Sequence, residues 1–509
     1  MTSRSSAADL AAATPEGRDR WIDFLRAFSI GAVVFGHWLV AVVVWEGGSV
    51  EGFNALERIP GFWPLTWVLQ VMPLFFFVGG FSNLVSLRAS QRRGEGYAGF
   101  LQGRFVRLMR PTIAFLAPAV VVVAVLDALN VADDFVFPVA NLITGPLWFL
   151  GVYMIVIALT PPMASLHDRF GVAVPLVCVG LAIAVDVLRF GFGVSAVGFA
   201  NYPIVWLLAH QWGFLYADRR LLPAHGRFLA PLGLAVAAAL VALGPYPNSM
   251  VGLATDEFSN MDPPTLPIVA LTLWEIGLAM LLRAPVARWL ERRRPWTAVV
   301  AINGVIMTAF LWHLTVMVVA IGILFPLGFP QPEVGTGSWW LLRPPWIVCL
   351  LVLLGGFVAL LGGIERAGFK RRHSGAPPNA VSALLAVVGA VATLWGVLGF
   401  AIGGLHQVFS PTGDVLIVLR LNPFQNVVHI AWGVTVMALA DSSRRHLAAA
   451  GSFVVATALA IAGPLLRSGG LTNILALNLE ADLLHAALAV VAAAAAVVWW
   501  ARRTEVAAA

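Results

Sequence analysis

The segment Trp21-Ile-Asp-Phe-Leu-Arg-Ala-Phe-Ser-Ile-Gly-Ala-Val-Val-Phe-Gly-His37 opens the first long apolar run of the chain. Within it, Arg26 and His37 are eleven residues apart. In a helix this separation is about three turns, so both side chains lie on one face, about 16 Å apart along the axis. If the run crosses a membrane, one group lies near the surface and the other deep inside. Ionisable side chains are costly in a bilayer, so the aligned pair indicates a functional site.

The composition identifies the class of protein. Of the 509 residues, 60% are hydrophobic and only 11% are charged, which is too little polar surface for a soluble protein of this size. Apolar runs of about 20 residues recur along the chain, long enough to cross a bilayer as helices. The runs are continuous rather than alternating, which excludes a closed barrel. We therefore predict an all-α, polytopic transmembrane helical bundle of about 14 spans.

The predicted spans fall into two groups. Ten lie near residues 24–45, 65–87, 111–128, 146–162, 172–189, 202–217, 228–244, 266–284, 297–323 and 345–363. Four more lie near 380–403, 424–440, 450–466 and 483–501. The predicted organisation is a cytoplasmic N-terminal tail (1–20), a ten-helix module (21–370), a polar linker (371–379), a four-helix module (380–503) and a C-terminal tail (504–509).

The loops between the spans alternate in charge, which predicts the orientation. Basic residues gather after the second, sixth, eighth and tenth spans: Arg88, Arg92, Arg93, Arg104, Arg107, Arg110; Arg219, Arg220, Arg227; Arg288, Arg292, Arg293, Arg294; Arg366, Lys370, Arg371, Arg372. The intervening loops are acidic. The positive-inside rule places the basic loops and both termini in the cytoplasm. The net charge of +6 arises from these loops, so it does not indicate a nucleic-acid partner.

Two further features concern targeting and metals. The first twenty residues are polar, with no short apolar core before the first span, so we predict no removable signal peptide. Cys178 and Cys349 both fall within apolar spans and offer no thiolate metal site. We expect no metal, and we expect a multi-pass protein of the inner, plasma membrane of a bacterium.

The four-helix module contains an internal repeat. The stretch Leu421-Asn-Pro-Phe-Gln-Asn-Val-Val-His-Ile-Ala431 matches Leu477-Asn-Leu-Glu-Ala-Asp-Leu-Leu-His-Ala-Ala487 at an offset of 56 residues. This offset predicts two helical hairpins repeated in parallel. Each copy carries a polar residue three before a histidine, ending at His429 and His485. The repeats either build a metal, haem or proton site or form paired polar contacts that join the helices, and we favour the contacts.

Polar and glycine residues mark candidate sites in the ten-helix module. Asp23 and Arg26 are three apart and can pair at the cytoplasmic end of the first span. Adjacent glycines Gly79 and Gly80 allow close approach of either a slender ligand or another helix. Arg104 and Arg107 share a helix face and suit phosphates, although a positive-inside anchor or lipid-headgroup contact is the alternative.

Three other ionisable residues lie near the middle of their spans. His210, Glu275 and His313 are each expected to face the bundle interior or a wet cavity. The alternative for each, and also for His37, is a single interhelical hydrogen bond.

The ordered set of motifs resembles a known family. Asp23-x-x-Arg26 with His37, then Phe-Phe-x-x-Gly-Gly-Phe ending at Phe81, then Arg104-x-x-Arg107 before Pro111, then Leu-Trp-Phe-Leu ending at Leu150, occur in this order. The chain over about residues 18–365 is similar to the integral membrane acyltransferases of acyltransferase family 3. Many relatives have Ser-Gly where this chain has Gly79-Gly80, so no role of that serine carries over. The four-helix module resembles a bacterial family known as a domain of unknown function.

The resemblance implies an activity. Family members move acyl groups, often acetyl, from cytoplasmic acyl-CoA, a co-substrate, to cell-envelope glycans, glycolipids or lipids outside the cytoplasm. It implies that Arg26 and His37 are an essential pair, and that His313 is the family's late-span histidine. Arg104 and Arg107 match its basic motif.

From these residues we hypothesise a mechanism. Arg104, Arg107 and Arg26 hold the phosphates of acyl-CoA, and its pantetheine arm lies along the glycines of the second span. His37 is the general base, and His313 orients the acceptor or stabilises the oxyanion. A transient acyl-histidine is the less favoured route.

Two other classes of function stay open at this point. Intramembrane polar residues also suit a membrane transporter or lipid flippase. The last four helices could alternatively be a partner-binding or regulatory platform.

Overall fold

The structure is a computed structural model that describes residues 6–46, 49–131, 133–367, 380–416, 418–468 and 472–508. The predicted linker 371–379, together with Lys370, lies outside the described residues. In the described part of the chain, twelve helices are long and apolar enough to cross a membrane. This confirms the all-α polytopic fold class.

The helices of the first 370 residues follow the apolar runs. They are α1 (Ala7–Ala12), α2 (Arg20–Val40), α3 (Pro64–Leu69), α4 (Met72–Arg92), α5 (Tyr97–Ala128), α6 (Asp133–Thr144), α7 (Leu147–Phe170), α8 (Ala173–Asp186), α9 (Asn201–Ala217), α10 (Gly226–Leu243), α11 (Leu266–Trp289), α12 (Arg293–Asn303), α13 (Ile306–Leu324) and α14 (Gly337–Arg366). Short turns η1 (Ala55–Glu57), η2 (Val187–Gly191), η3 (Ser195–Ala200) and η4 (Pro223–His225) connect some of them.

The remaining helices are α15 (Ala380–Gly403), α16 (Pro423–Ala440), α17 (Arg445–Ser468) and α18 (Leu479–Ala508). Two of the expected spans, 202–217 and 424–440, correspond to α9 and α16. Helix α9 has 17 residues and α16 has 18. Neither is among the twelve helices that are long and apolar enough to cross a membrane. Helix α9 is too short, and polar residues such as Asn426 lower the apolar content of α16.

The boundaries differ from the prediction at two places that matter for the site. The first span ends at Val40 instead of continuing to residue 45, because the chain forms the paired strands β1 (Ala41–Glu46) and β2 (Ser49–Asn54). The sequence of β1 is rich in valine, which favours a strand. The ninth span, expected to be continuous over 297–323, is divided at Gly304 into α12 and α13.

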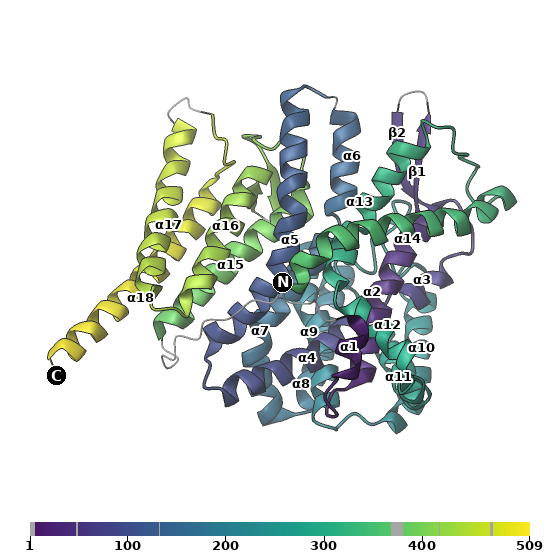
Figure 1. Cartoon of the computed structure of the whole chain (residues 1–509), viewed down its shortest axis with the longest axis horizontal. Helices are drawn as coiled ribbons and strands as arrows, with labels where there is room; N and C mark the ends of the chain where they lie inside the picture. The colour runs from purple at the N-terminus through teal and green to yellow at the C-terminus, as the bar shows by residue number, and fades with distance from the viewer. Residues whose placement is uncertain are drawn as a thin grey trace. The chain divides into compact units, whose positions relative to one another are not determined.

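The chain forms two compact units. The first comprises Met1–Trp45, Glu51–Val85 and Leu159–Gly362. Its helix α2 begins where the Asp19 side chain accepts hydrogen bonds from the amides of Trp21 and Ile22, which are otherwise without partners at a helix start. Helices α2 and α13 contact each other within this unit (Figure 1).

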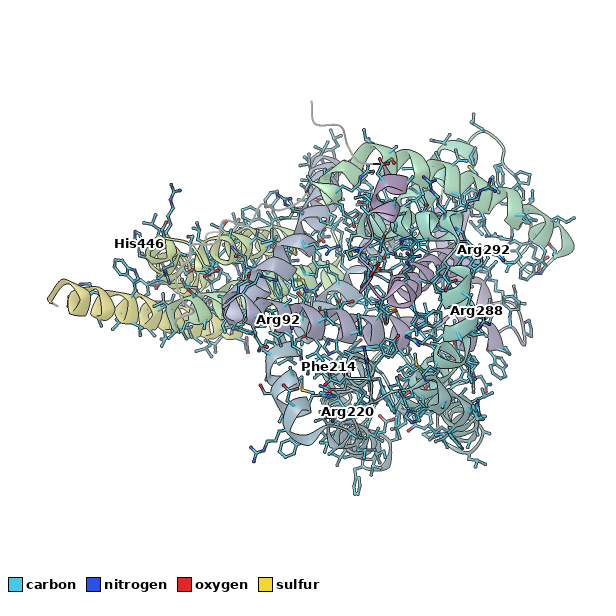
Figure 2. The ribbon with its side chains drawn as sticks, turned by 60° about the horizontal axis from the view of Figure 1, so that its bottom comes forward. Arg92, Phe214, Arg220, Arg288, Arg292 and His446 are labelled. Atoms are coloured by element: carbon cyan, nitrogen blue, oxygen red, sulfur yellow. The ribbon has the colours of Figure 1, made fainter. Side chains whose placement is uncertain are left out.

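Arginines gather where helices of the first unit end. Arg288 lies in the last turn of α11 and Arg292 directly precedes α12, and Arg220 follows α9 (Figure 2). These are the positions of the predicted basic loops.

The second unit comprises Glu46–Val50, Ser86–Ala158 and Gly363–Ala509. In it α15 pairs with α16 and α17 pairs with α18, which is the repeated hairpin arrangement predicted from the sequence (Figure 1). Strands β3 (Asp414–Leu416) and β4 (Leu419–Leu421) pair antiparallel between α15 and α16. His446 lies on α17 (Figure 2). Its imidazole stacks on Trp499 of α18 with ring centroids 5.0 Å apart.

Candidate active site

His37 and His313 meet in the first unit. Nδ1 of His37, on α2, lies 2.8 Å from Nε2 of His313, on α13. The two rings are nearly parallel, with centroids 5.1 Å apart and planes inclined by 19°. His313 is completely buried, whereas His37 is only half-buried. The structure therefore brings together two predicted site residues that are 276 positions apart, and it leaves His37 partly exposed.

Neighbouring groups fix the orientation of this pair. The other ring nitrogen of His313, Nδ1, lies 2.6 Å from the backbone oxygen of Phe310, one turn earlier on α13. The indole of Trp38 donates a hydrogen bond of 3.0 Å to the backbone oxygen of His313. Trp38 is the neighbour of His37 on α2, so this bond holds the two helices together beside the pair.

The hydrogen bonds determine which nitrogens carry protons. A carbonyl oxygen only accepts, so Nδ1 of His313 carries a proton and donates it to Phe310. If the ring is neutral, its Nε2 has a lone pair that accepts from Nδ1–H of His37. Nε2 of His37 is then the nitrogen with the available lone pair. This chain of donors, inferred from geometry, leaves the lone pair of the His37–His313 pair on Nε2 of His37.

Asp23 and Arg26 pair as predicted. Arg26 donates to a carboxylate oxygen of Asp23 at 3.0 Å, and Arg18 donates to the other oxygen at 2.5 Å. Arg26 also donates to the hydroxyl of Ser82 on α4 at 2.6 Å. Asp23 is buried, so its two guanidinium partners supply the compensation that a buried carboxylate requires. This network holds α2 against α4 at the end of α2 opposite His37.

The break between α12 and α13 is tied to the same network. The side-chain amide of Asn303 donates to the backbone oxygen of Asp23 at 2.9 Å. Asn303 is the last residue of α12, directly before Gly304. The helix end at Asn303, where the ninth span is interrupted, is therefore hydrogen-bonded to the first span.

Arg104 and Arg107 line a cavity in the second unit. The cavity has a volume of ≈ 280 Å³, and its wall is formed by Ser86, Ser90, Arg93, Glu95, Gly99, Phe100, Gly103, Arg104 and Arg107. Glu95 accepts hydrogen bonds from the Ser90 hydroxyl at 2.5 Å and from the Arg93 guanidinium at 2.8 Å. The hydrogen bond with Glu95 raises the pKa of Arg93. The lining thus has three arginines and one carboxylate, a net positive site that suits an anion.

The predicted glycine pair lies in a helix crossing. Gly79 and Gly80 are both buried on α4. A Cβ atom on Gly80 would lie 1.9 Å from the backbone oxygen of His210 on α9, and one on Gly213 would lie 2.1 Å from the backbone oxygen of Phe77. In the structure, helix α9 fills the space beside Gly80, so this glycine serves the close packing of α4 and α9.

His210 and Glu275 each make an interhelical hydrogen bond. Nε2 of His210 lies 3.2 Å from the side-chain amide nitrogen of Asn83 on α4. Glu275 accepts from the backbone amide of Leu74, in the first turn of α4, at 3.2 Å. A carboxylate at a helix N-terminus satisfies unpaired amides and complements the dipole. For both residues the structure shows the interhelical hydrogen bond that the sequence offered as the alternative to a functional site.

Several residues of the site were not among the predicted ones. They are Ser82, Trp38 and Phe310, which contact Arg26 and His313. Trp38 and Phe310 are immediate or near neighbours of the predicted histidines in sequence, and that adjacency is the signal that could have found them. In the described part of the chain, no three His, Cys, Asp or Glu side chains are grouped as a metal site requires.

The part of the chain that contains the histidine pair is similar to a known protein family. A family model described as an acyltransferase domain matches residues 19–362. The chain belongs to the acyltransferase family. The match contains His37, His313 and the arginine cluster, and it makes the protein an acyltransferase rather than a transporter or flippase. The acyltransferase is a multi-pass membrane protein.

The C-terminal part of the acyltransferase has its own match. A family model for a domain of unknown function matches residues 383–498, the region of the repeated hairpins. No curated protein and no solved structure matches the chain.

Proposed function

We propose that the acyltransferase moves an acyl group from cytoplasmic acyl-CoA to a hydroxyl group of a glycan, glycolipid or lipid outside the cytoplasm, across the plasma membrane of a bacterium. The observation that carries this proposal is the His37–His313 pair, in which a half-buried imidazole is hydrogen-bonded to a buried one. An O-acyl transfer needs a base for the acceptor hydroxyl, and an imidazole is the side chain best suited to that role near neutral pH.

The reaction proceeds as one addition and one elimination. Nε2 of His37 takes the proton of the acceptor hydroxyl. The hydroxyl oxygen attacks the thioester carbonyl and forms a new C–O bond. The tetrahedral intermediate collapses, the C–S bond breaks, and the CoA sulfur leaves with the proton that His37 holds. Ester and CoA thiol are the products, and His37 returns to its starting form. An acyl-histidine formed on the same nitrogen is the less favoured alternative.

His313 is assigned a positioning role. Both of its ring nitrogens are engaged, one by Phe310 and one by His37, so neither is left to stabilise an oxyanion. Its bond keeps the proton of His37 on Nδ1 and the lone pair on Nε2. This is the same logic by which a buried acceptor sets the tautomer of a catalytic histidine.

The donor is assigned to the basic cavity. Arg104 and Arg107 line it together with Arg93, and guanidinium groups bind phosphate oxygens through paired hydrogen bonds. The positive-inside rule places these residues in the cytoplasm together with both termini, and acyl-CoA is a cytoplasmic, phosphate-rich donor. Gly80 is packed against α9, so we do not assign it to the pantetheine arm.

The test of the donor assignment uses kinetics on the purified full chain. Arg104→Met and Arg107→Met should each raise the KM for acetyl-CoA about tenfold, because each removes charge-assisted hydrogen bonds to phosphate. The matched control is Arg92→Met, an exposed arginine of α4 that does not line the cavity. An unchanged KM in both cavity variants would remove the donor from this site.

The test of the function as a whole uses mass spectrometry of cell-envelope glycans and lipids. Cells with and without the gene are compared, and the gene is restored either as wild type or as His37→Ala. We expect one consistent acyl mass difference that wild type restores and His37→Ala does not. Restoration by His37→Ala would overturn the proposed role of the base, and the absence of any acyl mass difference would overturn the proposed acceptor class.

A further inference from the structure

A second cavity lies one helical turn beyond the histidine pair. Ala41 and Met317 both line it, and they follow His37 and His313 by four residues each. The backbone amide of Ala41 donates to the backbone oxygen of His37, so the cavity wall begins one helical turn after the proposed base. The cavity belongs entirely to the first unit. It lies toward the end of α2 that is opposite the Arg26 network.

The lining of this cavity is apolar and aromatic with one cation. Trp339, Trp346 and Phe325 contribute rings. The guanidinium of Arg343 lies over the ring of Trp339, 4.0 Å from its centroid. Such a lining accepts an apolar group and one anion.

Arg343 has no acidic partner among the residues that the structure describes, and its Nε is buried without a hydrogen-bond partner. Other arginines of the unit are paired: Arg58 bonds Glu51 at 3.3 Å, and Arg26 bonds Asp23. Removing a charge from water without a partner is costly. Stacking on Trp339 offsets part of that cost, and an anionic ligand would offset the rest.

Another part of the cavity wall is hydrogen-bonded to β1. The side-chain amide of Gln331 accepts from the backbone amide of Trp45 at 2.8 Å and donates to the backbone oxygen of the same residue at 3.4 Å. This pair of bonds fixes β1 against the segment that connects α13 with α14. These bonds connect one lining residue, Gln331, to the strand that supplies Ala41 and the valines of the wall.

We propose that this cavity binds the acyl acceptor, and that the acceptor is a lipid whose headgroup carries a phosphate and a hydroxyl group. The proposal rests on the proposed function, because it assigns the hydroxyl to His37. The phosphate pairs with Arg343, and the aromatic walls contact the apolar part. Helix α14, which supplies Arg343, also exposes apolar side chains such as Leu341, at 79%, so acyl chains of the acceptor can continue into the bilayer along it. A water-soluble phosphorylated glycan would offer the same anion without the chains.

Binding to the purified full chain tests the proposal. Three probes are compared: dioctanoyl phosphatidylglycerol, which has phosphate, hydroxyls and chains; dioctanoylglycerol, which lacks the phosphate; and glycerol 1-phosphate, which lacks the chains. We expect phosphatidylglycerol to bind most tightly. Arg343→Met should weaken its binding about tenfold, since a charge-assisted contact is lost, and should leave dioctanoylglycerol unchanged. Arg343→Lys keeps the charge and should recover part of the affinity.

The matched control is Arg58→Met, which removes an arginine that already has a carboxylate partner and should bind all probes like the wild type. Equal phosphatidylglycerol affinity in wild type and Arg343→Met would overturn the proposal. Equal affinity for glycerol 1-phosphate and phosphatidylglycerol would overturn the lipid as the acceptor and favour a soluble glycan.

The same binding is measured in His37→Ala, where it should be unchanged because the base is not needed to hold the lipid. If His37→Ala still transfers acyl groups while Arg343→Met loses lipid affinity, the catalytic role of His37 fails and the acceptor site stands. If His37→Ala is inactive and Arg343→Met binds phosphatidylglycerol normally, the catalytic role of His37 stands and the acceptor site fails.

Discussion

The molecule contains two histidine pairs that look alike and differ in access. In each, ring centroids are 5.1 Å apart and the planes are nearly parallel. In each, Nδ1 of one histidine bonds a backbone oxygen one turn earlier on its own helix: Phe310 for His313 and Gln425 for His429. The second ring nitrogen then meets the other histidine, at 2.8 Å for His37–His313 and 2.9 Å for His429–His485.

The difference is where the remaining lone pair lies. In the first pair it is on Nε2 of His37, which is half-buried and lies one helical turn before Ala41, a residue that lines a cavity. In the second pair it is on Nδ1 of His485, which is buried without a hydrogen-bond partner. The indole of Trp395 covers both rings of that pair, with centroids 4.4 and 4.9 Å away. Under the proposed function, the first pair acts on the acyl acceptor, whereas the enclosed second pair joins the two hairpins.

The comparison predicts the largest effect at His37. His37→Ala should lower the rate of transfer about 10²- to 10⁴-fold, the range for loss of a general base. The measurement is the initial rate of acyl transfer from labelled acetyl-CoA into an envelope lipid extract by the purified protein. His429→Ala, which removes a histidine from the second pair, is the matched control and should keep most of the rate. A His37→Ala protein that inserts normally and transfers at the wild-type rate would contradict the assignment.

A smaller effect is expected at His313. His313→Ala removes the acceptor for Nδ1–H of His37 and should lower kcat about 10- to 100-fold, while the KM for acyl-CoA stays unchanged because His313 does not touch the donor. His313→Gln supplies an amide oxygen as acceptor and should recover part of kcat. If His313→Gln were as impaired as His313→Ala, the hydrogen bond would not be what His313 contributes.

In the second pair the expected effect is on stability. His429→Ala leaves the imidazole of His485 buried without its partner and should lower the free energy of unfolding by about 1–3 kcal/mol. Thermal unfolding of the full chain in detergent measures this. A loss of transfer with unchanged unfolding would mean that the second pair takes part in the reaction and would erase the distinction between the two pairs.

The smallest effect on stability is expected at Trp395, whose indole stacks on the second histidine pair. Trp395→Phe keeps an aromatic ring but reduces the stacked area over His429 and His485, and should cost about 1 kcal/mol of stability. The same unfolding measurement applies. An increase in stability would show that the indole does not stabilise the pair.

The features that repeat along the sequence or depend on local spacing were predicted correctly. The long apolar helices, the repeat that aligns His429 with His485, and the spacing that pairs Asp23 with Arg26 are all local or self-similar, and the structure confirms them. The pairing of His37 with His313 depends on how α2 and α13 cross, and no pattern within either segment encodes a crossing. The start of β1 and the break at Gly304 were not predicted because both lie inside continuous apolar runs.

The glycine pair shows the same limit. Adjacent glycines predict that something approaches closely, but they do not say whether it is a ligand or a helix. The structure places α9 beside Gly80. Arg343 was not singled out from the sequence, because only the folded chain reveals that it lacks a carboxylate.

The tautomer of His37 is the most direct test of the account. In protein labelled with ¹⁵N-histidine and held in lipid nanodiscs, the His37 signals are assigned by their loss in His37→Ala, and the ring nitrogen shifts report which nitrogen carries the proton. We expect a neutral ring with the proton on Nδ1 and a bare Nε2, and a shift of the proton to Nε2 in His313→Ala. A wild-type ring with the proton on Nε2 and a bare Nδ1 would contradict this prediction, because the lone pair of His37 would then face His313 and not the acyl acceptor.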